Sequence, residues 1–198
     1  METEYEFLSF LGQGSYGKVF KARHRKSGKE CAIKQIQGIF FSNYEAKKIL
    51  REIHILRKLT SQKQNIFTAK LLDVIIPPSE TRAENDDRHD LPFDSIFLVQ
   101  ECFGQDLSQL IRNSDKIFLS EDHILVIIYN ILCGLQFMHS AQVVHRDIKP
   151  SNILLNSDSN VRICDLGLAK SLSNQSEPKF EERKENDDDN LPTNDNGR

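Results

Sequence analysis

Hydrophobic residues are spaced differently in the two halves of the chain, and the difference predicts which segments are strands and which are helices. In the first half, short apolar runs alternate with Gly, Ser and charged residues, as is typical of strands joined by turns. The predicted strands are residues 5–11, 18–23, 30–35, 70–76 and 95–100. Before the fourth strand, residues 44–59 repeat Ile and Leu at helical spacing and predict one amphipathic helix.

The second half of the chain is mainly helical. Residues 107–113 and 120–140 are periodic, and Ser120 followed by two acidic residues predicts a helix N-terminus with Ser120 as the N-cap. Two later apolar runs, residues 153–155 and 161–163, predict a pair of short strands. A strand-rich half containing one helix, followed by a helical half, predicts an α+β fold with two lobes.

Two segments are too polar to form part of a packed core. Residues 77–94 are rich in Pro, Asp, Glu and Arg and predict a solvated loop. Residues 171–198 contain a single aromatic side chain, Phe180, and an acidic run at 185–189. Such a segment cannot bury enough apolar surface to offset the entropy of ordering, so we expect a disordered acidic tail.

The composition is that of an ordinary globular protein, with 38% of the 198 residues hydrophobic and 28% charged. The net charge of −3 gives no indication of binding to nucleic acid or to a membrane surface. Residues 1–6 are acidic and lack the apolar segment of a signal peptide. The longest apolar stretch, residues 124–135, is interrupted by Tyr129 and Asn130 and is shorter than a bilayer span. We therefore expect neither nucleic acid nor a membrane as a partner.

The four cysteines are widely separated and form no CxxC pair, so neither a zinc site nor a disulfide framework is predicted. We expect them to act as small buried apolar residues in a reducing compartment, the cytosol or the nucleus. They are Cys31, Cys102, Cys133 and Cys164.

The first predicted turn matches the pattern G-x-G-x-x-G-x-V, in which glycines let backbone N–H groups approach a polyphosphate. The matching residues are Gly12, Gln13, Gly14, Ser15, Tyr16, Gly17, Lys18 and Val19. By itself the pattern also fits a tight hairpin turn or a dinucleotide-binding fingerprint. A dinucleotide site requires a helix after the glycines, whereas residues 18–23 predict a strand, so this interpretation fails.

Residues 31–34, Cys-Ala-Ile-Lys, match the V-A-I-K strand motif, in which the lysine contacts the α- and β-phosphates of ATP. The alternative is an exposed lysine on an edge strand, which is how most lysines occur. A phosphate-binding Lys34 needs an anion to hold it, and the predicted helix offers Glu45 and Glu52. Helical periodicity places Glu52 beside the apolar stripe that faces the sheet, so we favour Glu52 over Glu45.

Residues 145–152, His-Arg-Asp-Ile-Lys-Pro-Ser-Asn, match H-R-D-x-x-x-x-N and provide the strongest functional signal. In this pattern Asp147 accepts or orients the proton of an attacking hydroxyl, Asn152 coordinates a metal ion and Lys149 meets the transferred phosphate. A lone H-R-D would read as a polar turn before a strand. Lys149 and Asn152 also stand at the positions that the full pattern requires, which argues against a chance match.

Asp165 follows 18 residues after Asp147, in the sequence Asp-Leu-Gly. It supplies the second oxygen ligand that Mg²⁺ needs across the β- and γ-phosphates. An isolated Asp-Leu-Gly reads as an ordinary turn. Four elements thus occur in the order found in phosphoryl-transfer sites: the glycine loop, Lys34, residues 145–152 and Asp165. Together they indicate this chemistry more specifically than any one of them does alone.

Over residues 5–170 the chain resembles the protein kinase family, with a five-stranded antiparallel sheet and one helix in its first lobe. Lys149 points to the serine/threonine type, and residues 143–156 and 164–170 are similar to the MAP-kinase branch. The resemblance implies a first lobe at 5–103 and a partial helical lobe at 104–170. The acidic tail then stands in place of the rest of the activation segment.

The resemblance further implies ATP and Mg²⁺ as cofactors, and protein substrates and an upstream activating kinase as partners. Gln100 would be the gatekeeper, the Glu101 carbonyl and Phe103 amide would meet adenine, and Asp106 would meet the ribose. Four apolar side chains would enclose the adenine ring, although each could equally be part of the core. They are Leu11, Val19, Ala32 and Leu154.

Two features depart from the family pattern. Leu166 replaces the commoner Phe after Asp165, and it preserves an apolar plug. Neither A-P-E nor Thr-x-Tyr follows Asp165, so we expect an uncovered apolar side on helix 120–140 and marginal stability. The sequence thus predicts an ATP- and Mg²⁺-dependent protein serine/threonine kinase. The alternative is a truncated, catalytically silent nucleotide-binding or regulatory fragment.

Overall fold

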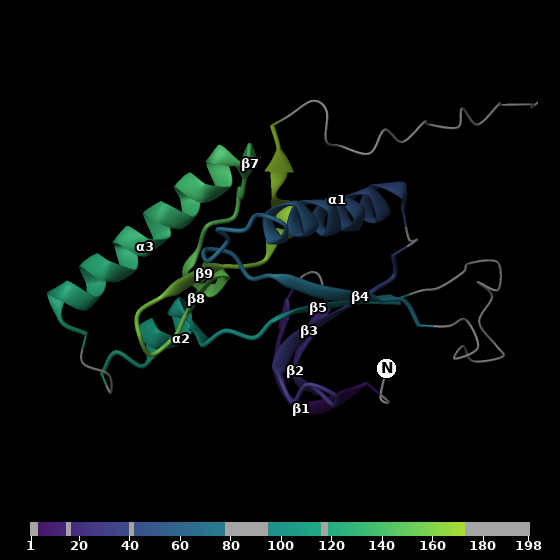
Figure 1. Ribbon diagram of the computed structural model, residues 1–198, viewed down its shortest axis with the longest axis horizontal. Helices are drawn as coiled ribbons and strands as arrows, with labels where there is room; N and C mark the ends of the chain where they lie inside the picture. The colour runs from purple at the N-terminus through teal and green to yellow at the C-terminus, as the bar shows by residue number, and fades with distance from the viewer. Residues whose placement is uncertain (1–3, 15–16, 40–41, 78–94, 116–118, 173–198) are drawn as a thin grey trace, which may run out of the picture.

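The computed structural model describes residues 4–14, 17–39, 42–77, 95–115 and 119–172. They form a strongly curled sheet on one side and a helical part on the other, with helix α1 beside the sheet (Figure 1). Residues 78–94 of the predicted loop (77–94) and residues 173–198 of the predicted tail (171–198) lie outside the described residues.

The first part is a five-stranded antiparallel sheet in the order β1-β2-β3-β5-β4. Its strands are β1 (Tyr5–Gly14), β2 (Gly17–His24), β3 (Glu30–Gln37), β4 (Leu71–Ile75) and β5 (Ser95–Glu101). All five predicted strands are therefore confirmed, with ends that differ by one to three residues. Their alternating apolar side chains give the sheet a buried cluster between its strands, including Ala22, Ile33 and Val99.

Helix α1 (Asn43–Thr60) packs its apolar stripe against this sheet. Ser42 begins the helix, because its side chain accepts a hydrogen bond from the Glu45 amide at 3.2 Å. Ile55 and Leu59 are almost fully buried in the core that α1 shares with β3 and β5. The helical period of residues 44–59 thus places one face of α1 on the sheet, as predicted.

The second part begins with β6 (Gln105–Asp106) and α2 (Leu107–Arg112). The predicted strand pair forms β8 (Ile153–Leu155) and β9 (Val161–Ile163), and β6 joins them in a three-stranded sheet ordered β6-β8-β9. Backbone bonds tie β9 to the segment after α1, with the Ile163 amide donating to the Phe67 carbonyl at 2.7 Å. These bonds fix the two parts of the molecule to each other.

Helix α3 (Glu121–Ser140) begins at Ser120, which forms a reciprocal capping box with His123. It packs on β7 (Val143–Val144) and β9 through Ile127, Gly134 and Met138. A Cβ atom at Gly134 would lie 2.9 Å from Cδ1 of Ile163, so glycine permits the close approach.

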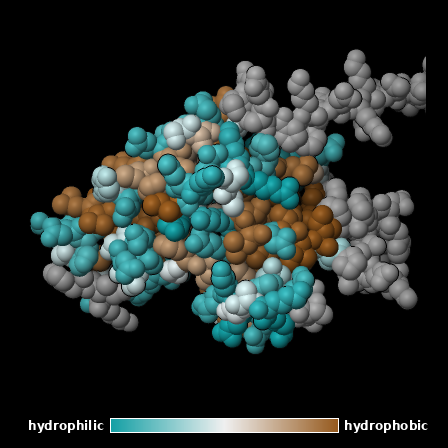
Figure 2. All heavy atoms as spheres, in the orientation of Figure 1, coloured by the Kyte–Doolittle hydropathy of each residue, from teal (hydrophilic) through white to brown (hydrophobic). Residues whose placement is uncertain are grey.

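The opposite face of α3 exposes a row of large apolar side chains, which appear as hydrophobic surface over this helix in Figure 2. The row consists of Ile124, Leu125, Val126, Ile128, Tyr129 and Leu132. The expected exposed apolar side is therefore confirmed. Among the described residues, α3 is long and apolar enough to cross a membrane by length and composition alone. The apolar segment is thus longer than residues 124–135 suggested, because the capped helix continues to Ser140.

The ordered chain extends slightly further than predicted. Strand β10 (Lys170–Ser171) pairs with β7, and the Leu172 amide donates to the Gln142 carbonyl at 2.8 Å. Ser171 and Leu172 belong to the segment 171–198 that we expected to be a disordered tail, yet Ser171 is buried within β10 and Leu172 is bonded to Gln142. Of the four cysteines, only Cys31 is fully buried, whereas the other three are partly buried, so that expectation is only partly correct.

Candidate active site

Lys34 lies at the centre of the site, between two carboxylates from distant segments. Its Nζ atom is 2.7 Å from Oε1 of Glu52 on α1 and 3.1 Å from Oδ1 of Asp165 after β9. Lys34 and Glu52 are both buried. Glu45 instead lies in the exposed first turn of α1 and pairs with Lys48 at 3.7 Å. The residue that meets Lys34 is thus Glu52, on the face of α1 that turns toward the sheet.

The two carboxylates keep Lys34 charged. Burial alone would lower the pKa of the ammonium group, but Glu52 and Asp165 outweigh it and raise the pKa above the usual lysine value. A positive charge held permanently between two anions can contact a polyphosphate without first taking up a proton.

The loop after β7 gathers three of the predicted catalytic side chains. Lys149 Nζ donates to Asp147 Oδ2 at 2.8 Å, and Asn152 Nδ2 donates to the same oxygen at 3.1 Å. Asn152 Nδ2 also donates to the Asp147 carbonyl at 2.9 Å. The hydrogen bond from Lys149 lowers the pKa of Asp147, so the carboxylate stays ionised and can accept a proton near neutral pH.

His145 connects this loop to the Asp165 segment, a role that the sequence reasoning did not assign. Its buried ring lies with Nε2 2.9 Å from the Cys164 carbonyl, and its Nδ1 accepts a hydrogen bond from the Asp147 amide at 3.2 Å. A neutral ring with the proton on Nε2 satisfies both bonds. Leu166 is also buried, in the same apolar core as the inner face of α1, as expected of an apolar plug. The sequence signal that could have indicated this structural role of His145 is its position within the polar turn of residues 145–152.

Asn152 and Asp165 are suited to hold Mg²⁺. The Cys164 amide donates to the Asn152 carbonyl at 3.0 Å, which fixes the two segments beside each other. Asp165 has a left-handed backbone with φ 58°, which turns its carboxylate toward Lys34. Because Asn152 uses its amide nitrogen to bind Asp147, its oxygen is left as a donor of the hard kind that Mg²⁺ prefers. No group of three or more His, Cys, Asp or Glu that could hold a metal ion gathers among the described residues.

The glycine loop forms the hairpin between β1 and β2, where Gly14 pairs with Gly17. Gly17 has φ 134°, and a Cβ atom there would lie 1.9 Å from the Gln35 carbonyl oxygen. Gly12 has open space where its Cβ would be, while Gln13 and Lys18 are exposed. Ser15 and Tyr16 lie outside the described residues.

The residues expected around adenine come from the five-stranded sheet and from the three-stranded sheet that contains β8. Val19 and Ala32 are partly buried on β2 and β3, Leu11 is exposed at the end of β1, and Leu154 lies on β8. Ala32 is paired with Gln100 across β3 and β5. The five-stranded sheet thus supplies one side of the expected slot and β8 the other.

Asp106 has a local partner that the sequence reasoning did not consider. Its side chain caps α2, since Oδ1 accepts from the Gln109 amide at 2.9 Å and from the Ser108 hydroxyl. One oxygen of the carboxylate is therefore engaged by the chain itself.

Cys164 precedes Asp165 and is the thiol nearest the site. Burial raises its pKa to about 12, with Asp165 adding to the rise. The thiol is thus protonated at neutral pH and is a poor nucleophile, which favours the inert interpretation of this cysteine.

Comparison with known proteins identifies the family. The profile of the protein kinase domain matches residues 5–186, most of the chain. The chain therefore belongs to the protein kinase family.

Its relatives include mitogen-activated protein kinases. Mitogen-activated protein kinase KSS1 of Saccharomyces cerevisiae is 38% identical over 177 residues, which cover 88% of this chain and 44% of that relative. Mitogen-activated protein kinase 1 of Oryza sativa subsp. japonica is 39% identical over 163 residues, which cover 82% of this chain and 37% of that relative. Extracellular signal-regulated kinase 1 of Dictyostelium discoideum is 37% identical over 166 residues, which cover 84% of this chain and 28% of that relative. The chain thus spans less than half the length of these relatives.

Proposed function

We propose that the chain carries the ATP- and Mg²⁺-binding site and the catalytic loop of a MAP-kinase-like protein serine/threonine kinase. The observation that carries the proposal is the contact of Lys34 with both Glu52 and Asp165, at 2.7 and 3.1 Å. Three segments meet there in the arrangement that a kinase needs to grip phosphates and metal together.

The chemistry follows from the residues around this contact. Lys34 would hold the α- and β-phosphates, and bound Mg²⁺, held by Asn152 and Asp165, would neutralise charge on the β- and γ-phosphates. The substrate hydroxyl oxygen forms a bond to the γ-phosphorus while the bond to the β-phosphate oxygen breaks, which releases ADP. Asp147 orients the hydroxyl and accepts its proton, and Lys149 stabilises the charge on the transferred group.

Phosphate transfer tests the proposal. The chain is incubated with Mg²⁺ and γ-labelled ATP and a generic basic protein, beside Asp147→Asn, which keeps the size of the side chain but cannot take the proton. We expect incorporation by the wild-type chain and a loss of about 10²-fold or more in the variant. Equal incorporation at background level would contradict kinase activity of this chain.

A second readout separates the kinase from the alternative regulatory function. Mg²⁺–ATP should raise the melting temperature of the wild-type chain, because it binds the folded state only. Binding without transfer would favour a catalytically silent nucleotide-binding module. The absence of both would contradict a nucleotide-dependent function of either kind.

The partners and location of the protein are part of the same proposal. The relatives include mitogen-activated protein kinases and an extracellular signal-regulated kinase. We infer protein substrates and an upstream activating kinase for this chain by that similarity, and the cytosol or nucleus as its location. The proposal names neither nucleic acid nor a membrane as a partner.

A further inference from the structure

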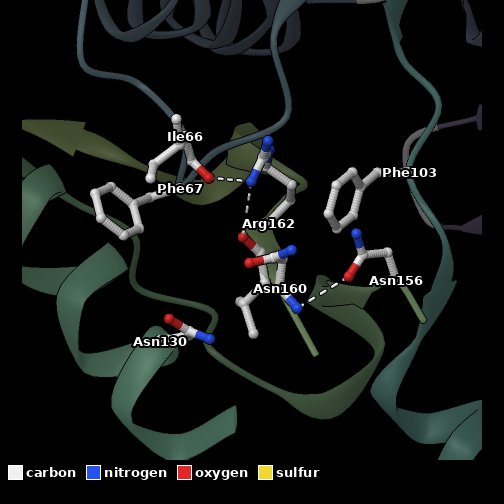
Figure 3. Close-up of a pocket in the computed structure, with 8 residues that line it drawn as sticks. Ile66, Phe67, Phe103, Asn130, Asn156, Asn160 and Arg162 are labelled. Carbon is white, nitrogen blue, oxygen red and sulfur yellow. Dashed lines mark hydrogen bonds between the residues drawn. The ribbon is translucent and has the colours of Figure 1, made fainter. Parts of the chain in front are cut away.

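Arg162 on β9 contacts the two residues whose backbone groups are expected to face adenine. Its guanidinium lies 4.5 Å from the centre of the Phe103 ring, and its Nε atom is 3.6 Å from Oε2 of Glu101. Figure 3 shows Arg162 beside Phe103, on the side where its NH1 atom also reaches the Ile66 carbonyl. One side chain thus joins β9, the segment after α1 and the linking segment 101–104 between the two parts.

The contact with Glu101 is partly buried, since the Arg162 and Glu101 side chains are 15% and 30% exposed. Arg162 Nε and Glu101 Oε2 are both inaccessible to solvent, and neither has a hydrogen-bond partner among the described residues. Each atom is therefore the other's main source of charge compensation at 3.6 Å. Without the guanidinium, this inaccessible carboxylate oxygen would have no cation beside it, which favours a shift of the Glu101 side chain and of the segment that carries it.

The surroundings offer the linking segment little other support on this side. A cavity of about 240 Å³ lies next to Arg162, with Phe67, Asn130 and Asn156 among its lining residues (Figure 3). The linking segment is held elsewhere by backbone bonds, such as the Glu101 amide to the Lys70 carbonyl at 2.9 Å. Among the described residues, the Arg162 side chain contacts both Glu101 and Phe103.

Arg162 also lies close to the expected adenine slot. It is directly opposite Leu154 in the β8–β9 pair, and side chains in such pairs project from the same face. Leu154 is the residue expected beneath the adenine ring, so a change at position 162 acts immediately beside the base. The pairing of Arg162 with Leu154 therefore places Arg162 beside the expected adenine site rather than far from it.

We propose that Arg162 is a positioning residue for adenine recognition, which holds segment 101–104 so that the Glu101 carbonyl and Phe103 amide face the base. The proposal rests on the function proposed above. It predicts that Arg162 determines how well the chain distinguishes adenine from other bases, in addition to any effect on stability.

The test measures dissociation constants for Mg²⁺–ATP and Mg²⁺–GTP by competition in the full chain. Arg162→Met keeps the aliphatic length of the side chain but removes the charge and the donors. We expect it to weaken ATP binding about tenfold and GTP binding less than about threefold, because guanine has a carbonyl oxygen in place of the 6-amino group from which the Glu101 carbonyl would accept. Arg162→Lys keeps the charge and should recover part of the preference for ATP. Arg57→Met, at an exposed arginine in the last turn of α1, is the matched control and should change neither constant.

The outcomes separate this proposal from the proposed function. If Arg162→Met lowers the melting temperature but leaves the ATP-to-GTP ratio unchanged, Arg162 is merely structural and the proposal is overturned. If wild-type chain binds neither nucleotide, the proposed function itself fails. Wild-type binding with an intact ratio in Arg162→Met overturns only the role of Arg162.

Discussion

Lys34 is a buried cation whose charge is balanced by Glu52 and Asp165. We expect Lys34→Met to destabilise the fold by on the order of 3 kcal/mol, because Glu52 stays buried without its partner. The double variant Lys34→Met/Glu52→Gln should recover part of this loss but should not recover nucleotide binding. Melting temperatures with and without Mg²⁺–ATP measure both effects. A single variant as stable as the wild type would contradict the buried-pair account.

Lys149 controls the charge state of Asp147. Because its hydrogen bond lowers the pKa of Asp147, the ionised form is kept as pH falls below the ordinary aspartate value. Lys149→Met should therefore raise this pKa and shift the acidic limb of the kcat/KM profile to higher pH. Lys149→Arg keeps the charge and should leave the limb close to its wild-type position. An unchanged limb in Lys149→Met would show that Asp147 is not the titrating group.

At the scale of single residues, the sequence was sufficient where a motif fixes the spacing and insufficient where a contact depends on the fold. Lys34 and Glu52 could be paired because helical periodicity puts Glu52 on the inner face of α1. The contact of Arg162 with Glu101 could not be foreseen, since it joins β9 to a segment with no shared motif. The capping role of Asp106 was missed because the family pattern assigned that residue to the ribose.

At the scale of elements, the crossing of segment 101–104 over β8 requires glycine at position 104. Gly104 has φ 42°, and a Cβ atom there would lie 1.6 Å from the Leu155 carbonyl oxygen. Gly104→Ala should therefore destabilise the chain by clearly more than the roughly 1–2 kcal/mol cost of a left-handed alanine. Gly28→Ala is a matched control, because Gly28 has φ 68° and open space around its Cβ position. Equal losses in the two melting temperatures would contradict the steric explanation.

Helix α3 has one packed face and one exposed apolar face. Leu125→Gln and Leu132→Gln should change the melting temperature little and reduce self-association, because both side chains are mostly exposed. Ile127→Gln should lower the melting temperature strongly, because this side chain is buried against the core. Thermal melts and light scattering at increasing concentration measure the two effects. A large loss of stability in Leu125→Gln would show that this face is packed in solution.

The long elements were predictable because their hydrophobic periods extend over many residues, as in α1 and α3. The two-residue strands β6, β7 and β10 were not, because a pair of residues carries no period and is ordered by backbone bonds to distant segments. The pairing of residues 171–172 with the β7 region was not foreseen for the same reason.

At the scale of the whole molecule, the sequence predicted the two-part α+β architecture from the change in hydrophobic spacing. It could not predict how the parts are joined. That junction consists of backbone bonds between β9 and the segment after α1, together with the contact of Lys34 and Asp165 across 131 positions. The candidate site lies at this junction, so the site exists only when both parts fold together.

The most direct test of the central claim is calorimetric titration of the chain with ATP in the presence and absence of Mg²⁺. Saturable ATP binding that strengthens with Mg²⁺ is the result that the site geometry predicts. Asp165→Asn should remove most of the Mg²⁺ dependence while the chain stays folded, because the variant loses the carboxylate expected to hold the ion. Binding that is indifferent to Mg²⁺, or unchanged in Asp165→Asn, would contradict the assignment of Lys34, Asn152 and Asp165 as the phosphate and metal site.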